Sequence, residues 1–503
     1  MKPLKRAFSL SCNIDSLVAA ALGFFLIYLL TGHSGIGVSP DSVAYLSVAR
    51  NLDSGYGLTQ FDRMPMIEFP LFYSVVLWVI ARIARLDPLV FTPVLNEFLF
   101  ALLLYLSGSL MNVFRCRSIL YKRLMLGCLL LSPCLLEVYS MMWSETLFLL
   151  CVLVFLMMVW AYLQSHSRLS LTGLCLVTAV AADTRYAGIS LIATGLILIY
   201  LDPWESLKQK WRNFYVFGLS SSSLLAMNLF RNQRLTGTLT GFRQPGTTPL
   251  MRNIFFYGDT VTDWMPFPKA REWIGVATGL GLLAYLIFFG ARSLVRRKEG
   301  WSMERLAILF TCVYSVFLIF SSTVTRYQQL DSRLLSPIFI PLLWSLSFWL
   351  PSRQSRLPGQ AGAWILGLGV LLMLAFQYNQ LKQDYETYDG VKDAGIPGYT
   401  EDPWTQGETV SFLRANPLFF QPGYSLYSNA GDAVYFASRL FCDQLPQRVV
   451  PHEMQEFFSD NEFYLIWFND IQNPDMIGLH EILEKKKMNC LKQFEDGAIY
   501  ICP

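Results

Sequence analysis

Acidic and basic residues recur in short motifs beside apolar stretches of this sequence. The motifs are "PDSVAYL" with Asp41, "MIEFPLF" with Glu68, "MWSETLF" with Glu145, "ADTRYAG" with Asp183 and Arg185, and "TRYQQLDSRLLSP" with Arg326, Asp331 and Arg333. A carboxylate can serve as a general base for an acceptor hydroxyl or amine. An arginine binds phosphate through a planar, bidentate fork. These residue types together suit chemistry at a lipid phosphate.

The composition identifies a membrane protein. Of the 503 residues, 53% are hydrophobic and 15% are charged, whereas soluble domains have about 25% charged residues. The net charge of +3 at pH 7 is too small to indicate a nucleic-acid partner. The first apolar run follows several basic residues and precedes no A-x-A-like cleavage site, so we predict a retained first span rather than a signal peptide.

Apolar runs and basic loops together predict the topology. The runs lie near residues 14–32, 91–113, 122–139, 143–163, 170–183, 186–201, 212–230, 272–290, 304–322, 334–350 and 361–377. A shorter run, 70–86, ends in arginines, and we place it at the interface or as a re-entrant segment. The strongly basic loops then all face the cytoplasm, and they are "FRCRSILYKR", "KQKWR", "RSLVRRK" and "PSRQSR". We therefore predict roughly eleven spans, with the N-terminus inside and the C-terminus outside.

This topology places the charged motifs on the outer face, opposite the basic loops. The outer loop 231–271 adds further arginines, including Arg243. A charged group at the bilayer centre costs about 2.5–3.5 kcal/mol on insertion scales, and a position at a span end avoids this cost. The motifs are therefore either ordinary loop residues or parts of one site, and their convergence on one face favours a site.

After about residue 379 the long hydrophobic runs stop, and hydrophobic and polar residues are mixed. We divide it into a transmembrane domain, 1–378, with a first outer loop at 33–90, and a small extracytoplasmic α/β domain, 379–503. In the second domain, "YSLYSNAGDAVYFAS" predicts a strand, a turn and a helix. "FYLIWF" predicts a short strand, and "LKQFEDGAIYIC" predicts a hairpin with its turn at Asp496-Gly497.

Cysteines and histidines indicate no metal or redox motif. The ten cysteines include no C-x-x-C pair, and the four histidines show no metal-ligand spacing. Cys442, Cys490 and Cys502 fall in the predicted outer domain, where an oxidising compartment permits a disulfide whose pairing stays open. The sequence has no glycine-rich phosphate loop and no Gly-x-Ser-x-Gly elbow, so soluble-nucleotide chemistry lacks support.

The motifs and their order resemble those of GT-C-fold glycosyltransferases that use lipid-linked sugars, in particular the protein O-mannosyltransferase and aminoarabinose transferase group. "SPDSVAYLSVARNL" is similar to the family's first-loop D-x-x-x-Y helix, and "IEFPLFYSVVLWV" to its E-x-P-L segment. "MWSETLF" occupies the place of a second-loop acid, "DTRYAG" resembles a loop with a basic residue, and "DSRLLSPIFIPLL" is similar to an R-Y-x-x-P segment. The resemblance covers roughly residues 14–350, and Phe69 stands where some relatives have a lysine.

The resemblance implies an inverting transfer of a sugar from a polyprenyl-phosphate carrier to a glycan, lipid or protein acceptor. Asp41 would be the general base, while Glu145 and Glu68 would orient the acceptor or support the site. The residues that would hold the donor phosphate are Arg185, Arg333, Arg243 and Arg326, and those assigned to acceptor or sugar binding are Tyr45, Tyr186, Tyr327 and Asp331. No cofactor is certain, although some more distant GT-C enzymes use a divalent metal at the acidic residues.

Each candidate residue also has a purely structural interpretation. Asp41 could be a helix N-cap, Glu145 a first-turn acid, and Arg185 and Arg333 anchors at the headgroup level.

Two other functional classes compete with a glycosyltransferase. One is a transporter or flippase of a lipid-linked glycan, and the other is a non-catalytic assembly protein with the GT-C fold. The sequence has no internal repeat and its charges cluster at one surface, which argues against a transporter. No Asn-x-Ser/Thr sequon is present, which favours a bacterial inner membrane, with the active site and C-terminal domain on the periplasmic or extracellular side.

Overall fold

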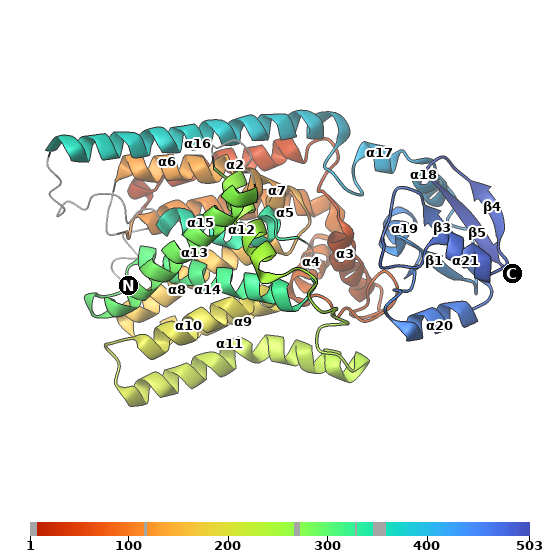
Figure 1. Cartoon of the computed structure of the whole chain (residues 1–503), viewed down its shortest axis with the longest axis horizontal. Helices are drawn as coiled ribbons and strands as arrows, with labels where there is room; N and C mark the ends of the chain where they lie inside the picture. The colour runs from red at the N-terminus through yellow and green to blue at the C-terminus, as the bar shows by residue number, and fades with distance from the viewer. Residues whose placement is uncertain (1–7, 115–117, 266–271, 327–328, 346–358) are drawn as a thin grey trace. The chain divides into compact units, whose positions relative to one another are not determined.

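The computed structural model describes residues 8–114, 118–265, 272–326, 329–345 and 359–503. Within these ranges the chain is mainly helical, with a small sheet near the C-terminus (Figure 1). The chain forms two compact units. The helical unit comprises Met1–Leu29, Ile67–Tyr73 and Val94–Asp389, and the mixed unit comprises Leu30–Met66, Ser74–Pro93 and Gly390–Pro503.

The apolar runs of the sequence coincide with helices that lie wholly or largely in the helical unit. These are α2 (Ile14–Leu30), α5 (Pro88–Met111), α6 (Ile119–Leu130), α7 (Pro133–Ser140), α8 (Glu145–Ser165), α9 (Arg168–Thr184), α10 (Ile189–Leu201), α11 (Leu207–Thr236), α13 (Glu272–Val295), α14 (Met303–Val324), α15 (Ser332–Ser345) and α16 (Gly359–Ala394). The helix α12 (Leu250–Asp263) was not among the predicted runs and lies in the predicted loop 231–271, and residues 346–350 of the run 334–350 lie outside the described residues. Single 3₁₀ turns are η1 (Leu10–Cys12), η2 (Tyr186–Gly188) and η3 (Arg297–Glu299).

The predicted run 122–139 is not one continuous helix. The axes of α6 and α7 are bent by 49°. Ser132 caps α7 by accepting a hydrogen bond from the Leu135 amide, and Pro133 occupies its first helical position. Proline has no N–H to donate to the preceding turn, so it starts a new helix here instead of continuing α6.

Several helices are long and apolar enough to cross a bilayer. Among the described residues these are α5, α8, α13 and α14, and the bent pair α6–α7 brings the number to five. The helices α2 and α10 are apolar but shorter. The apolar helices agree with an integral membrane protein, while the count of roughly eleven spans stays a prediction.

The short run 70–86 forms α4 (Phe72–Ala84), a helix of 13 residues. At 1.5 Å per residue such a helix is about 20 Å long, which is less than the roughly 30 Å of a hydrocarbon core. Its Ile83 side chain is 78% exposed. This length agrees with our placement of the segment at the interface or as a re-entrant element.

The mixed unit contains α3 and a five-stranded sheet with short helices. Its helices are α3 (Pro40–Asp53), most of α4, α17 (Asp402–Thr405), α18 (Glu408–Ala415), α19 (Gly431–Ser438), α20 (Pro451–Ser459) and α21 (Leu479–Lys485). Its strands are β1 (Ser425–Ser428), β2 (Asp443–Gln444), β3 (Phe463–Phe468), β4 (Asn489–Gln493) and β5 (Gly497–Cys502). The predicted strand–turn–helix, the "FYLIWF" strand and the terminal hairpin are therefore confirmed.

The strand order in this sheet is β2-β1-β3-β5-β4. Strand β1 runs parallel to β2 and β3, whereas β5 is antiparallel to β3 and β4. One apolar cluster of this unit gathers around Phe463, Leu465 and Phe457. The described cysteines are all free thiols, and in the sheet Cys490 faces Tyr500 while Cys502 faces Phe463.

Segments far apart in the sequence build the mixed unit together. The Arg50 guanidinium donates to both oxygens of Asp87 at 2.9 Å, and Arg439 reaches the same carboxylate at 3.0 Å. The Tyr399 amide donates to the Val38 carbonyl at 2.8 Å. The predicted first outer loop thus contributes to this unit, and the domain boundary that we predict at residue 378 falls inside α16.

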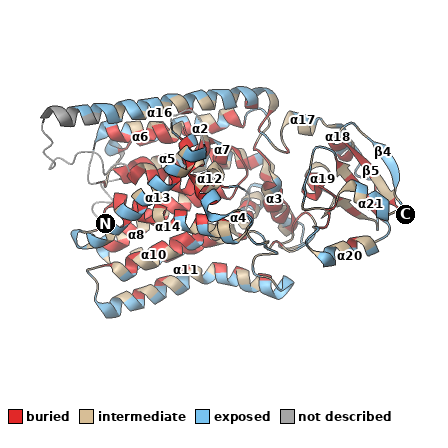
Figure 2. Ribbon diagram, in the orientation of Figure 1, coloured by how far each residue is buried: buried red, intermediate tan, exposed pale blue. Residues whose placement is uncertain are grey.

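Burial differs sharply between helices of the helical unit. In Figure 2, α8 is largely buried, whereas α11 shows many exposed and intermediate residues. Exposed apolar side chains on α11 include Leu219 at 74% and Met227 at 69%. In a membrane protein such side chains face lipid rather than water. The buried helix α8 carries Glu145 at its first position.

Candidate active site

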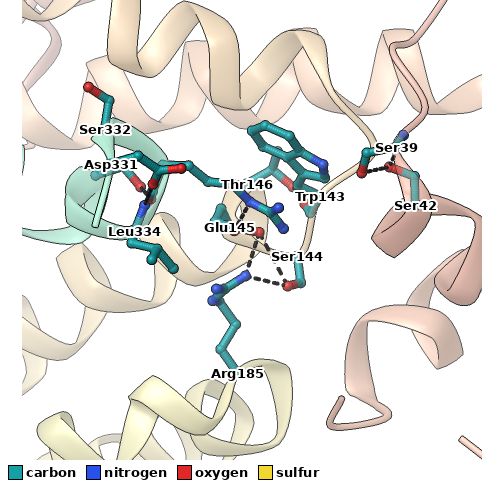
Figure 3. A network of polar contacts seen from close by, with 12 residues as sticks. Ser39, Ser42, Trp143, Ser144, Glu145, Thr146, Arg185, Asp331, Ser332 and Leu334 are labelled. Atoms are coloured by element: carbon teal, nitrogen blue, oxygen red, sulfur yellow. Dashed lines mark hydrogen bonds and ion pairs between the residues drawn. The ribbon is translucent and has the colours of Figure 1, made fainter. Parts of the chain in front are cut away.

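Glu145 lies between two arginines in the helical unit. Its Oε2 is 2.5 Å from Arg185 Nη1, and its Oε1 is 2.5 Å from Arg333 Nε. The Glu145 side chain is 1% exposed, and those of Arg185 and Arg333 are 18% and 11% exposed. Figure 3 shows Arg185 directed toward Ser144 and Glu145. Both oxygens of the carboxylate are therefore engaged by guanidinium groups.

Three chain segments bring these charges together. Glu145 is the first residue of α8, Arg185 follows the last residue of α9, and Arg333 lies in the first turn of α15. Glu145 is in the first turn of α8, where the helix dipole favours a negative charge. Its interpretation as a first-turn acid is therefore confirmed, and the same carboxylate also forms the two ion pairs. The two arginines are largely buried and paired with a carboxylate, so their interpretation as lone headgroup anchors is wrong.

Ser144 and Trp143 complete the surroundings of the ion pairs. Ser144 Oγ accepts a hydrogen bond from Arg185 Nη1 at 3.0 Å. The Arg333 Cζ atom lies 4.0 Å from the centre of the Trp143 ring, a cation–π distance. The motif "MWSETLF" thus supplies three consecutive residues to the cluster, and the sequence analysis singled out only Glu145.

Asp331 supports the start of α15. Its Oδ1 accepts a hydrogen bond from the Leu334 amide at 2.9 Å, as an N-terminal capping side chain does. Burial raises the pKa of Asp331 above its usual value, with the Glu145 charge adding to this effect, whereas the Leu334 amide and Arg333 lower it. Asp331 therefore helps to fix Arg333, and its predicted role in acceptor binding stays a prediction.

Glu68 belongs to a second polar group of the helical unit. Its backbone carbonyl accepts a hydrogen bond from Arg243 Nη2 at 2.9 Å. The preceding carbonyl, of Ile67, accepts from the Tyr186 hydroxyl at 3.0 Å. Asn232 donates to the Leu239 carbonyl at 2.8 Å and so shapes the end of α11. Predicted residues Glu68, Arg243 and Tyr186 are thus brought together. Asn232 was missed because only the charged residues of its arginine-rich segment were considered.

Arg326 fixes the loop between α11 and α12 to the end of α14. Its amide donates to the Gln244 carbonyl at 2.9 Å, and its Nη1 donates to Gln244 Oε1 at 2.6 Å. Gly246 lies so close to α14 that a Cβ atom there would be 2.1 Å from the Thr323 carbonyl oxygen. Only glycine fits this close approach of two backbones.

The two polar groups are joined through consecutive residues. Arg185 pairs with Glu145 while Tyr186, the next residue, binds the segment that carries Glu68. Consecutive Cα atoms are about 3.8 Å apart, so these groups share one region of the helical unit. Tyr327, predicted to bind acceptor or sugar, lies outside the described residues.

Asp41 and Tyr45 lie in the mixed unit, on α3. Ser39 is the N-cap of this helix, its amide donates to Ser42 Oγ at 3.1 Å, and Pro40 is the first helical residue. The N-cap interpretation of Asp41 is therefore wrong. Tyr45 is 1% exposed and packs in the core, whereas Asp41 is half-buried.

A divalent metal does not fit at Glu145. Both oxygens of this carboxylate face guanidinium groups, which would repel a cation. Across the described ranges, no group of three or more His, Cys, Asp or Glu side chains is arranged to hold a metal ion. Two guanidinium groups meet the Glu145 carboxylate, and the acidic side chains of Asp331 and Glu137 lie near enough to interact with these charges.

Known proteins resemble this chain in their structures and not detectably in their sequences. No protein-family model matches the sequence, and no curated protein matches it significantly. ArnT from Cupriavidus metallidurans bound to undecaprenyl phosphate is similar, with a TM-score of 0.57, 14% identity and 97% coverage of both chains.

Two further solved structures are similar. The arabinofuranosyltransferase AftD from Mycobacteria gives a TM-score of 0.53 at 13% identity, covering 97% of this chain and 40% of that one. AglB, an oligosaccharyltransferase from Archaeoglobus fulgidus in complex with an inhibitory peptide and a dolichol-phosphate, gives 0.52 at 9% identity, covering 92% of this chain and 70% of that one. The chain therefore has the fold of these transferases, and the GT-C fold expected from the sequence motifs is confirmed.

Proposed function

We propose that this chain transfers a sugar from a polyprenyl-phosphate carrier to an acceptor at the outer face of the membrane. The observation that carries the proposal is the convergence of Arg185 and Arg333 on the buried carboxylate of Glu145. It is supported by the fold shared with ArnT, which has been solved with undecaprenyl phosphate bound.

The arginine pair suits a phosphate ligand by the number and the planar arrangement of its donors. A guanidinium has five N–H donors on three nitrogens, so one arginine can bind a carboxylate and a phosphate together. Glu145 faces Nη1 of Arg185 and Nε of Arg333. In this account Glu145 is a positioning residue: it holds the two guanidinium groups in one orientation.

The proposed reaction is a displacement at the anomeric carbon of the sugar. The acceptor hydroxyl or amine attacks this carbon, its proton passes to the Asp41 carboxylate, and the bond from carbon to the phosphate oxygen breaks. Polyprenyl phosphate leaves with the bonding electron pair, and Arg185 and Arg333 stabilise its growing negative charge. Attack opposite the leaving phosphate inverts the anomeric carbon.

In this proposal the second polar group, formed around Glu68, helps to bind the acceptor. Arg243 and Tyr186 fix the backbone on either side of Glu68, so the Glu68 side chain projects from an anchored segment. A donor that arrives already activated on a lipid needs no nucleotide on the outer side. We place the protein in a bacterial inner membrane, with the reaction on the periplasmic or extracellular side.

The test is mass spectrometry of cell-envelope glycans from cells with and without the gene. We expect one glycan modification to be lost on deletion, restored by the wild-type gene and not restored by Asp41→Asn. The control is Asp53→Asn on the same helix, because Asp53 is exposed and its one ion pair among the described residues is an exposed contact with Arg82 at 3.4 Å. Restoration by Asp41→Asn, at equal protein levels in the membrane, would refute the base assignment.

A further inference from the structure

A groove of about 580 Å³ runs between α9 and α11 in the helical unit. The two helices pack along each other (Figure 1). From α9 the groove is lined by Arg168, Leu171 and Ala179 among others, and from α11 by Arg212, Val216 and Ser223 among others. It therefore combines two arginines and Asn213 with an otherwise apolar and small-residue lining.

Both arginines lie at the same end of the groove. Arg168 is the first residue of α9, and Arg212 lies in the second turn of α11. Near the other end of α9, Ala182 packs with Leu225 of α11 in one apolar cluster. The helices thus run parallel, and the arginine end is remote from Arg185, which follows the last residue of α9.

The arginine end has the features of a membrane interface. Trp211, beside Arg212, stacks on Tyr215 with ring centres 5.7 Å apart and contacts Tyr200 at 5.5 Å. Tryptophan and tyrosine concentrate at the headgroup level of membrane proteins. The sequence predicts this end, with the basic segment "KQKWR", to face the cytoplasm.

The charges at this end suit a phosphate group. Within the described ranges neither Arg168 nor Arg212 forms an ion pair, and Arg212 Nε donates only to Asn213 Oδ1 at 3.2 Å. Both side chains are exposed and line the same groove. Two guanidinium groups without carboxylate partners complement the negative charge of a lipid phosphate.

The length of the groove indicates which kind of lipid fits in it. Its α9 lining extends from Arg168 to Ala179, which is about 16 Å at 1.5 Å per residue. One leaflet of a hydrocarbon core is about 15 Å deep, half of roughly 30 Å. An acyl chain of a glycerophospholipid fits this depth, whereas an undecaprenyl chain is much longer.

We propose that this groove binds an anionic glycerophospholipid. The phosphate lies at Arg168 and Arg212, and one acyl chain lies along the α9–α11 groove. The lipid occupies the leaflet opposite the proposed active site. A charge-assisted hydrogen bond from a guanidinium to the lipid phosphate corresponds to at least about a tenfold gain in affinity, so the two arginines together account for about 100-fold.

The test is native mass spectrometry of the full-length, delipidated protein titrated with phosphatidylglycerol. We expect Arg168→Gln/Arg212→Gln to weaken binding about 100-fold. The control is Lys208→Gln/Lys210→Gln, which removes two positive charges from α11 at positions that do not line the groove. We expect this control to bind phosphatidylglycerol nearly as tightly as the wild type.

A second variant tests the apolar part of the groove without changing its charge. Ala179→Phe fills the groove between the helices, and we expect it to weaken phosphatidylglycerol binding while the protein still elutes as a single species. Equal affinity in the wild type and both groove variants would overturn the proposal. An equal loss in the lysine control, or displacement of phosphatidylglycerol by undecaprenyl phosphate, would also overturn it.

Discussion

Glu145→Gln tests whether the carboxylate holds the two arginines in place. Glutamine has no charge and offers one carbonyl oxygen, so at most one of Arg185 and Arg333 keeps its acceptor on this side chain, while Arg185 still donates to Ser144. Each of these arginines now has its own carboxylate oxygen at 2.5 Å. Removing one partner of a buried ion pair costs about 3–5 kcal/mol. Because glutamine keeps one hydrogen bond, we expect the lower value, about 3 kcal/mol, which is roughly 150-fold in the folding equilibrium.

The assay is SDS-induced unfolding of the full-length protein in detergent micelles. The matched control is Glu97→Gln on α5, because Glu97 is 3% exposed and forms no ion pair within the described residues. We expect this control to keep or raise the free energy of unfolding, since it removes a buried carboxylate that lacks a cationic partner.

A double-mutant cycle separates pairing from general damage to the fold. Arg185→Gln should destabilise the wild type, and it should cost less in the Glu145→Gln background because the partner charge is already absent. The reasoning is refuted if Glu145→Gln is as stable as the wild type, or if the two substitutions add without coupling.

Three further predictions concern the same units. Trp143→Leu removes the cation–π contact with Arg333 and should lower the free energy of unfolding by about 0.5–2 kcal/mol, measured by the same SDS titration; no change would contradict the contact. Gly246→Ala places a Cβ against the Thr323 carbonyl oxygen, so we expect faster proteolysis of the loop that follows α11, whereas unchanged cleavage would show that the loop adapts. Burial, together with nearby acidic groups, raises the pKa of Asp443 to about 6. The folded state therefore binds the proton more tightly than the unfolded state does. The free energy of unfolding should fall as the pH rises from about 4 to about 6 and should stay constant above pH 6. Thermal melting across this range should show the slope, and Asp443→Asn should remove it.

Local sequence signals were enough to predict many elements. The D-x-x-x-Y resemblance predicted the helix α3, although its N-cap is Ser39 and not Asp41. Asp496-Gly497 predicted the turn between β4 and β5, because turn chemistry depends on neighbouring residues. The apolar runs likewise coincide with helices. The break between α6 and α7 was missed, although Pro133 provides a local signal for it.

Contacts between distant residues could not be read from the sequence. Glu145 and Arg333 are 188 residues apart, and nothing in either motif specifies that they form an ion pair. The assembly of the mixed unit depends in the same way on Arg50, Asp87 and Arg439 from three separate segments. The motifs indicated which residue types matter, while tertiary packing decides that Glu145 pairs with arginines instead of facing an acceptor.

Binding of undecaprenyl phosphate to the full-length protein in nanodiscs tests the central claim most directly. A charge-assisted hydrogen bond contributes about 1.5–3 kcal/mol, so we predict that Arg185→Gln and Arg333→Gln each raise the dissociation constant about 10- to 150-fold. The control variant Arg168→Gln/Arg212→Gln, at the other end of α9, should bind like the wild type. Wild-type affinity in both Arg185→Gln and Arg333→Gln would contradict the account.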